Sequence, residues 1–330
     1  MGYSHWSHDD YSTRQHVRRQ RGVDAFDYDR HVRSTGRYVV HERMNPYGVA
    51  FRESRDSVQH PESVPIGVFF DVTGSMGSIP RMLQTKLGAL MRTLVARGYV
   101  AHPQVLFGAV GDAYTDRVPL QVGQFESGLE MDDDLSRIVI EGGGGGQVHE
   151  SYELALYFFA RHTATDAWDK RRKKGYLFLM GDEMPYDAVR RDQVQALLGD
   201  RMEASRPIEH LIAEVQERYH LFFLTVTQGH HGRSPRVQQR WRDLLGERAL
   251  LLDDPEAVSE TIALQVGLVE GTVQDLGHAA DDLVAAGFDA NAVRTASKAV
   301  AKYDATSTFP GVASGTLPPP SGTDGDSGRL

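Results

Sequence analysis

The sequence predicts an α/β protein with an open, mostly parallel, doubly wound sheet and helices on both faces. Three observations indicate this class. Short, continuous apolar runs, such as residues 66–70 (IGVFF), are typical of central parallel strands. Segments with apolar residues three or four positions apart alternate with these runs, as amphipathic helices do. Polar or glycine-rich loops follow several runs, as in folds that bind ligands at the carboxyl ends of their strands.

The first predicted strand, residues 66–70, leads into a helix that begins at Ser78–Ile79–Pro80 and stops at Gly98. Proline is tolerated in a first helical turn, and glycine commonly ends a helix. The other expected elements are strands at 105–110, 119–125 (an edge strand), 176–180, 221–226 and 249–252, and helices at 134–140, 150–160, 187–198, 207–218, 235–245 and from Asp254–Pro255 to Gly267. A further helical segment is expected at about 270–303.

We expect four parts: an N-terminal arm (1–60), a core domain (61–268), a C-terminal helical extension (269–304) and a disordered tail (305–330). The arm is polar and lacks helical or alternating periodicity, so it is expected to wrap the core through a few apolar anchors. Residues 37–54 are expected to form a hairpin that turns at Asn45–Pro46–Tyr47–Gly48. Metal binding by the arm's histidines, including His5, His8 and His16, is the less favoured interpretation.

The composition argues against several classes of function. The 330 residues are 40% hydrophobic and 25% charged, as in globular proteins, and the net charge of −9 argues against a generally basic nucleic-acid binder. The absence of cysteine excludes disulfides, thiolate zinc sites and cysteine nucleophiles. No apolar run approaches the ~18 residues of a membrane span, and the first residues resemble no signal peptide. We therefore expect a soluble, cytoplasmic protein with neither membrane nor nucleic acid as its partner.

The loop after the first strand is the strongest candidate for a functional site. Asp71, Thr73 and Ser75 follow the apolar run at positions i, i+2 and i+4. In a turn this spacing directs all three oxygens to one side. Mg²⁺ suits such a set, because it takes six oxygen ligands at about 2.1 Å and keeps some of its waters. The alternative interpretation is a polar turn whose hydroxyls cap the next helix.

Two later loops offer further acids. In the first, a run of five glycines precedes Gln147-Val148-His149-Glu150-Ser151, and glycine lets a backbone approach an ion closely. Glu150 is either a ligand or a simple helix cap. His149-Glu150 does not begin an HExxH zinc motif, because position 153 is Glu. In the second loop, Asp182 follows the strand at 176–180 and is expected at the same site, whereas Glu183 is more readily a turn residue.

On these residues the chain resembles the von Willebrand factor A family. Asp71-Val72-Thr73-Gly74-Ser75 matches its metal-ion-dependent adhesion site, D-x-[ST]-x-S, and the likeness covers about residues 64–268. The resemblance implies that Asp71, Thr73, Ser75 and Asp182 hold a metal. It implies Glu150 as the second-loop ligand, with Ser151 as the substitute, because the commoner threonine after Gly-Gly is missing. The implied cofactor is Mg²⁺, with Mn²⁺ or Ca²⁺ as alternatives.

The resemblance also implies a non-enzymatic, protein-binding module whose metal is completed by a partner's carboxylate. Intracellular bacterial members of the family often act as adaptors or scaffolds beside AAA+ ATPases, so such a system is an expected partner. The chain itself has no GxxxxGK[ST] phosphate-binding loop.

Two other functions fit parts of the sequence. Asp71-Val72-Thr73-Gly74-Ser75 also resembles the aspartyl-phosphate motif of haloacid-dehalogenase-type phosphohydrolases, in which Asp71 would be the nucleophile beside Mg²⁺. Position 73 lacks the acid that most of those enzymes use for proton transfer. The other alternative is a metal-free structural scaffold. Asp112 and Asp116, which end the second strand, are expected as turn residues, and the basic run 170–174 as a solvated face.

Overall fold

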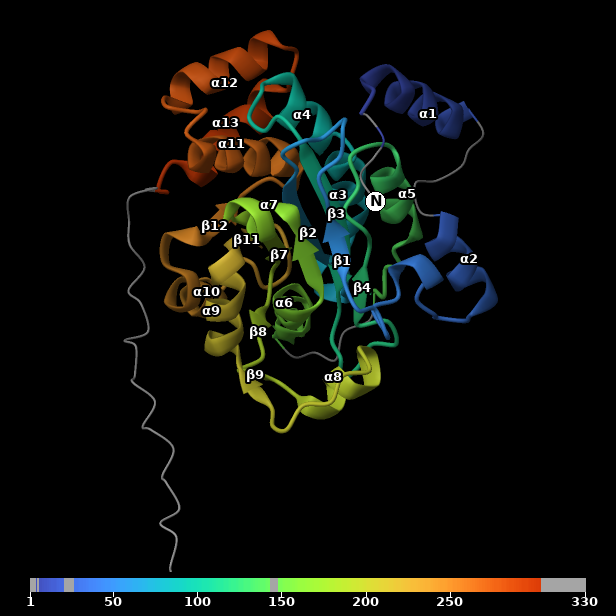
Figure 1. The fold of residues 1–330 in the computed structure, drawn as a ribbon. Helices are drawn as coiled ribbons and strands as arrows, with labels where there is room; N and C mark the ends of the chain where they lie inside the picture. Colours follow the sequence, from blue (N-terminus) through green and yellow to red (C-terminus); the bar gives the residue numbers. More distant parts are fainter. Residues whose placement is uncertain (1–3, 5, 21–26, 143–147, 304–330) are drawn as a thin grey trace, which may run out of the picture.

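The computed structural model describes residues 4, 6–20, 27–142 and 148–303. A six-stranded sheet runs through it in the order β12–β11–β7–β2–β3–β4 (Figure 1). Its strands are β2 (Val64–Asp71), β3 (Pro103–Val110), β4 (Leu120–Val122), β7 (Gly175–Gly181), β11 (Tyr219–Val226) and β12 (Ala249–Leu252). All neighbours are parallel except β4, which pairs with β3 in the antiparallel sense. The predicted mostly parallel sheet is confirmed.

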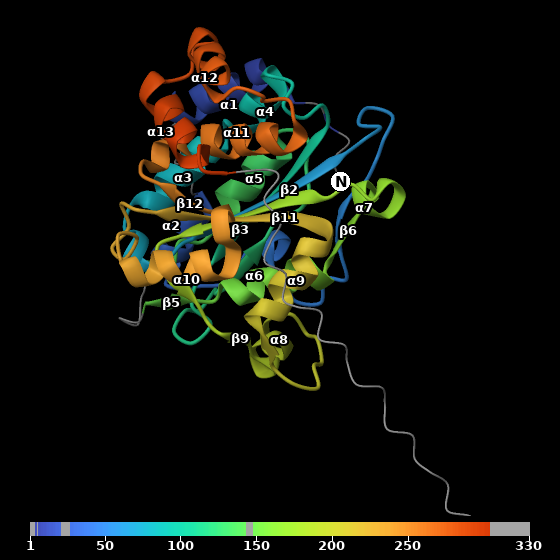
Figure 2. The same ribbon diagram turned by 90° about the vertical axis from the view of Figure 1, so that its left-hand side faces the viewer.

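Helices cover both faces of the sheet (Figure 2). Side chains alternate across β2, so Val68 and Phe70 are buried on one face and Phe69 on the other. The first face is covered by α3 (Ile79–Leu87), α4 (Leu90–Ala96), α5 (Glu130–Arg137), α11 (Val258–Glu270), α12 (Leu276–Ala285) and α13 (Ala290–Val300). The second is covered by α6 (Tyr152–Arg161), α8 (Arg191–Leu197), α9 (Ile208–Arg218) and α10 (Pro235–Leu245). The doubly wound fold is therefore as predicted.

The order of the strands reverses between β2 and β7. From β2 the chain winds outward through β3 to β4, and from β7 it winds the other way through β11 to β12. At such a switch point the loops after the two central strands diverge and leave room for a ligand. Asp71 is the last residue of β2 and Asp182 directly follows β7, so both acids lie at this point.

Two predicted helices have different bounds. The helix after β2 is broken into α3 and α4, and a side chain at Gly88 in the break would meet the Tyr11 hydroxyl at 2.3 Å. The helix expected to stop at Gly267 begins with a short 3₁₀ turn, η4 (Pro255–Ala257), and continues to Glu270. It ends before Gly271, whose φ of 72° supplies the left-handed cap. Gly267 serves close packing against Tyr99 and Val273 instead.

Other bounds shift for local reasons. The helix expected at 134–140 is α5, which ends at Arg137; Ile138 is extended, and residues 138–140 are buried. The helix expected at 150–160 starts only at Tyr152, because His149–Glu150 form a short strand, β5, paired with β8 (Met184–Pro185). The helix expected at 187–198 is shortened to α8 by β9 (Ala188–Val189), which pairs with β10 (Arg206–Pro207). The segment at 270–303 is two helices, α12 and α13, which pack with α11.

The N-terminal arm is more ordered than its composition predicts. It contains α1 (His8–Gln20), α2 (Asp27–Thr35) and a 3₁₀ turn, η1 (Glu42–Met44). Helix α1 is held by polar contacts rather than by an apolar stripe: Arg18 contacts Asp132 of α5 at 2.6 Å, and Arg14 pairs with Asp133. Because hydrophobic periodicity does not report such contacts, the helices of the arm could not be predicted from its sequence pattern.

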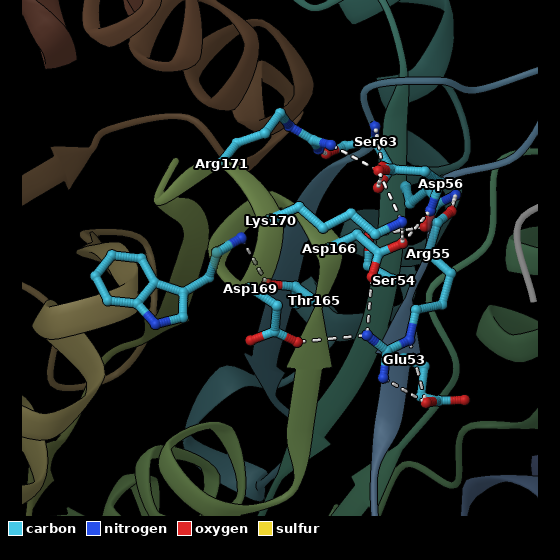
Figure 3. Close-up of polar contacts among 12 residues, drawn as sticks. Glu53, Ser54, Arg55, Asp56, Ser63, Thr165, Asp166, Asp169, Lys170 and Arg171 are labelled. Atoms are coloured by element: carbon cyan, nitrogen blue, oxygen red, sulfur yellow. Dashed lines mark hydrogen bonds and ion pairs between the residues drawn. The ribbon is translucent and has the colours of Figure 1, made fainter.

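The expected hairpin at 37–54 is also absent. Residues Arg52–Ser54 form β1, which pairs in parallel with β6 (Thr163–Thr165) instead of folding back on the preceding segment. An ion-pair network ties this strand to α7 (Asp166–Arg171) (Figure 3). In it Arg55 contacts Asp166 at 2.9 Å, and Asp56 contacts Arg171 at 2.6 Å. The predicted turn itself forms, since the Val49 N–H donates to the Pro46 carbonyl at 3.2 Å and Gly48 has a φ of 70°. The chain after the turn, however, pairs with β6 and not with the segment before the turn.

The network also accounts for the basic run at 170–174. Lys170 lies 2.7 Å from Asp166, Arg171 pairs with Asp56, and Lys173 lies 2.7 Å from Glu270. These cations are therefore engaged within the chain. Figure 2 places α7 and β6 at the end of the molecule opposite β5, and thus away from the candidate site.

The predicted tail at 305–330 and most of the glycine run fall outside the described residues, and the boundaries of the four predicted parts remain predictions. Within the described part of the chain, none of the helices has the length and apolar character needed to span a membrane.

Candidate metal centre

Asp71 is the innermost residue of the candidate site. Its side chain is fully buried at the end of β2, and both of its oxygens accept hydrogen bonds. Oδ1 accepts from the Thr73 backbone N–H at 2.8 Å and from the Thr73 hydroxyl at 2.5 Å. Oδ2 accepts from the Tyr152 hydroxyl at 3.1 Å. The carboxylate is thus fixed by its own loop and by the first residue of α6.

A chain of hydroxyls connects Asp71 to the third predicted loop. The Thr73 and Ser75 hydroxyl oxygens lie 3.2 Å apart, and the Ser75 hydroxyl donates to Oδ1 of Asp182 at 2.8 Å. Oδ2 of Asp182 accepts from the His231 backbone N–H at 2.8 Å. The structure therefore brings Asp71, Thr73, Ser75 and Asp182 together, and the expected common direction of the first-loop oxygens is observed.

Glu150 reaches the same place through β5. Parallel pairing with β8 sets Glu150 opposite Pro185, and Glu183 lies just before β8. Both Glu150 and Glu183 are buried, and within the described structure Oε2 of each carboxylate has no hydrogen-bond partner. Ser151, not Glu150, occupies the N-cap position of α6, so Glu150 is not a helix cap. The Ser151 hydroxyl accepts from the Ala113 N–H at 2.9 Å and is engaged in holding the neighbouring loop.

The acids raise one another's pKa values. Burial, followed by the charge of Asp182, holds the pKa of Asp71 well above its ordinary range. Burial and the charges of Asp71 and Glu183 raise the pKa of Glu150 to about 12. Burial and Asp182 raise the pKa of Glu183 to about 7. Without a positive charge nearby, burial and mutual repulsion favour the protonated form of these carboxyls. A cation bound among them would favour the ionised form instead.

The chemistry of the donors fits a hard divalent cation. All the donors are carboxylate or hydroxyl oxygens, the ligand class of Mg²⁺, Mn²⁺ and Ca²⁺. The unpartnered oxygens of Glu150 and Glu183 are buried acceptors that a cation or its bound water would satisfy. In the described part of the chain, no three acidic or histidine side chains are grouped closely enough to hold a metal by themselves.

Glu183 and Tyr152 are site residues that sequence reasoning did not select. The sequence favours a turn role for Glu183, and no pattern in it points to Tyr152. The adjacent acids after β7 were a visible signal for Glu183, but its burial depends on the β5–β8 pairing, which is not encoded locally. Tyr152 carries no motif. The absence of a side chain at Gly181 leaves room for the Tyr152 hydroxyl, because a Cβ at position 181 would lie 1.8 Å from it.

Asp112 and Asp116 flank a turn, as expected, but the turn is not solvated at Asp112, which is buried. Oδ2 of Asp112 accepts from the Thr115 hydroxyl at 2.9 Å, and Oδ1 accepts from the Tyr186 hydroxyl at 3.1 Å. Asp116 accepts from the Asp112 N–H at 2.8 Å. These bonds order a loop beside the site but do not connect either acid to the hydroxyl chain.

An aromatic wall of His149, Tyr186 and Tyr114 lies on that side of the site. The His149 ring stacks on Tyr186 with centroids 5.3 Å apart, and Tyr186 contacts Tyr114 at 4.6 Å. The guanidinium of Arg190 lies 5.8 Å from the Tyr114 ring centroid. Tyr114 is 49% exposed, so the wall extends from a buried acid cluster to the surface.

Helix α2 connects the arm to the site. The buried Asp29 accepts from the Ile140 N–H at 3.0 Å through Oδ1, and from Arg33 at 2.9 Å and Arg81 at 2.6 Å through Oδ2. Arg81 belongs to α3, which follows the metal loop, and Ile140 leads to Gly142, whose N–H donates to the Val72 carbonyl at 3.2 Å. One carboxylate therefore links both loops that supply candidate ligands.

Neither a protein-family model nor a curated protein matches the chain. Among solved structures, the pilus adhesin SpaC from Lactobacillus rhamnosus GG, in its open conformation, has a TM-score of 0.45 and 12% identity over 65% of this chain and 31% of that one. Proximal thread matrix protein 1 from the mussel byssus has a TM-score of 0.40 and 13% identity over 62% and 47%. Its form with a zinc-occupied MIDAS motif has a TM-score of 0.39 and 13% identity over 64% and 48%.

This chain thus spans less than half the length of each of these proteins. Likenesses this distant say nothing about what the chain binds.

Proposed function

We propose that the chain is a von Willebrand factor A-type module that binds a divalent cation, Mg²⁺ first, and presents it to an acidic side chain of a protein partner. One observation carries the proposal. The hydroxyls of Thr73 and Ser75 connect two buried carboxylates, Asp71 and Asp182, through successive short contacts at the switch point of the sheet. A helix cap needs none of this, and the metal-ion-dependent adhesion motif requires all four residues.

Each residue has a definite part in the proposal. Asp71, Thr73, Ser75 and Asp182 hold the cation directly or through water, and Glu150 supplies the ligand of the second loop. Two neutral hydroxyls among the ligands leave positive charge on the cation, which favours one more anionic ligand from outside. Tyr152 and the His231 N–H keep the two aspartates oriented.

The proposed role is non-enzymatic. Both oxygens of Asp71 already accept hydrogen bonds, and its side chain is fully buried, which fits a fixed ligand better than a nucleophile approached by a phosphate. A cytoplasmic adaptor or scaffold that works with an AAA+ ATPase remains part of the proposal on the strength of the family resemblance alone.

Thermal unfolding with added metal tests the proposal. The full chain is first treated with a chelator and then titrated with Mg²⁺, Mn²⁺ and Ca²⁺, in wild type and in Asp71→Asn. A ligand that binds only the folded state adds about 2.7 kcal/mol at 100 times its Kd. We expect wild type and the control Asp281→Asn, an exposed acid on α12, to be stabilised, and Asp71→Asn to be unaffected. No shift in wild type at millimolar metal contradicts the proposal.

A further inference from the structure

The loop after β11 also reaches the candidate metal centre. The backbone N–H of His230 donates to the Ser75 carbonyl at 3.1 Å. The backbone N–H of His231 donates to Oδ2 of Asp182 at 2.8 Å. Gly229 permits this close approach, because a Cβ at that position would lie 2.5 Å from the Cβ of Asp182. The backbone of the loop is therefore fixed against two of the candidate ligands.

The side chain of His231 contacts the acid that follows Asp182. Its Nε2 lies 3.7 Å from Oε1 of Glu183. Only 4% of the Glu183 side chain is exposed, against 27% of the His231 side chain. The other oxygen of this carboxylate, Oε2, has no hydrogen-bond partner among the residues that the structure describes. The pair thus joins a buried, incompletely satisfied carboxylate to a partly exposed imidazole.

Glu183 belongs to the acid cluster of the centre. Burial is the main cause of the raised pKa of Glu150, and the charges of Asp71 and Glu183 add to it. Burial and the charge of Asp182 raise the pKa of Asp71, and the charge of Glu183 contributes there as well. Because the carboxylate of Glu183 acts on both residues, an imidazole beside it lies beside the centre itself.

The spacing of Glu183 and His231 suits a shared cation better than a direct bond. A hydrogen bond from nitrogen to oxygen spans about 2.7–3.2 Å, and the observed separation of 3.7 Å is longer. Two donors that each lie about 2.1 Å from one ion are at most about 4.2 Å apart. One ion could therefore contact both side chains at the separation that they already have.

We infer that the imidazole of His231 and the carboxylate of Glu183 are further ligands of the candidate metal centre. This inference rests on the proposed function and deepens it. The adhesion motif offers only oxygen donors, which suit Mg²⁺ and Ca²⁺, whereas an imidazole nitrogen suits Zn²⁺. The centre would then bind Zn²⁺ more tightly than its oxygen donors alone would. His231 adds to that centre and does not form a separate site, since nowhere in the described ranges do three acids or histidines form a metal-holding group by themselves.

Pulsed electron paramagnetic resonance with Mn²⁺ tests the inference. Mn²⁺ takes oxygen ligands as Mg²⁺ does, so it should occupy the centre whether or not His231 coordinates it. An imidazole nitrogen bonded to Mn²⁺ couples magnetically to the electron spin, and the coupling is visible in the spin-echo modulation. The full chain is treated with a chelator and loaded with less Mn²⁺ than protein. We expect nitrogen coupling in wild type and its loss in His231→Gln, which retains the backbone contact to Asp182.

His230→Gln is the matched control. His230 is the exposed neighbour on the same loop, and its ring centroid lies 4.8 Å from that of His231. This variant should keep the nitrogen coupling. Bound Mn²⁺ without nitrogen coupling in wild type, or coupling that survives in His231→Gln, overturns the inference.

Displacement of the bound Mn²⁺ measures the choice of metal. His231→Gln should raise the Zn²⁺ concentration needed for displacement by about tenfold, and the Mg²⁺ concentration by less than about twofold. An equal change for both ions contradicts a nitrogen ligand.

The same measurements separate this inference from the proposed function. If Asp71→Asn abolishes Mn²⁺ binding and wild type shows no nitrogen coupling, the inference fails and the proposed metal centre stands. If Asp71→Asn binds Mn²⁺ as wild type does, with coupling that His231→Gln removes, the proposed ligand set fails and nitrogen ligation by His231 stands. If wild type does not retain Mn²⁺, both fail.

Discussion

The hydroxyl of Ser75 donates a 2.8 Å hydrogen bond to Asp182, across 107 positions of sequence. This bond closes the gap between the loops after β2 and β7, the two central strands of the sheet. In the absence of a cation the Ser75 proton lies between two oxygens that would both be metal ligands. Under the proposed function, a cation bound there would take both oxygens as ligands and turn the Ser75 proton outward.

The first prediction concerns the two hydroxyls. Thr73→Ala combined with Ser75→Ala should lower Mg²⁺ affinity by about 100-fold or more, because two of the neutral ligands are lost. The sheet should remain folded, since the hydroxyls bond to carboxylates of the site and not to the core. Calorimetry gives the affinity and circular dichroism the fold. Thr85→Ala, an exposed hydroxyl on α3, is the control. Unchanged Mg²⁺ affinity in the double variant would refute the ligand assignment.

The second prediction distinguishes Glu150 from Ser151 as the second-loop ligand. Glu150→Gln should weaken Mg²⁺ binding, and in chelator it should stabilise the fold by about 1–3 kcal/mol, because it removes a buried acid that is crowded by Asp71 and Glu183. Ser151→Ala should instead destabilise the loop at Ala113, which bonds to the Ser151 hydroxyl, and leave Mg²⁺ affinity nearly intact. Chemical unfolding with and without Mg²⁺ measures both effects. The opposite pattern would assign the ligand to Ser151.

Hydrophobic periodicity predicted the parts of this molecule that depend on burial. The strands at 66–70 and 176–180 are continuous apolar runs, and β2 and β7 contain them, so Asp71 and Asp182 at their ends could be selected from the sequence. Thr73 and Ser75 could be selected because their spacing with Asp71 lies within a single loop. The residues that were missed depend on distant pairing. Glu183 is buried by the β5–β8 contact, and α1 is held by acids more than 100 positions away.

The third prediction concerns the link from the arm to the site. Asp29→Asn should lower the free energy of unfolding by about 2 kcal/mol, because the buried carboxylate pairs with Arg33 and Arg81. This is less than a fully buried ion pair would contribute, since both guanidiniums are partly exposed. The variant should also weaken Mg²⁺ binding. The amides of Val72 and Gly142 should exchange with solvent faster, because both loops lose a common anchor. Asp27→Asn is the control, since the ion pair of Asp27 with Arg30 joins two exposed side chains on α2. Equal Mg²⁺ affinity in both variants would limit Asp29 to a structural role.

The last prediction is the pH dependence of stability that arises from His220, far from the metal centre. Burial, and then the charges of Lys174, Arg248 and Lys173 against that of Glu270, lower the pKa of His220 to about 4 from an ordinary 6.5. A histidine with a depressed folded-state pKa binds fewer protons in the native state than in the unfolded state. Its contribution is therefore fully present above pH 6.5 and is lost as the pH falls from 6.5 towards 4.

His220→Phe keeps a ring against Tyr176, whose centroid lies 5.3 Å away, and cannot be protonated. Between pH 7 and pH 4 the wild type should lose up to about 3 kcal/mol more stability than this variant, since each pKa unit corresponds to about 1.4 kcal/mol. Urea unfolding in chelator across this range measures the difference without a contribution from metal binding. His278→Phe, at an 80% exposed position, should follow the wild-type profile. Parallel profiles for wild type and His220→Phe would mean that His220 accepts a proton without leaving its site, because the carboxylate of Glu270 then compensates for the surrounding cations.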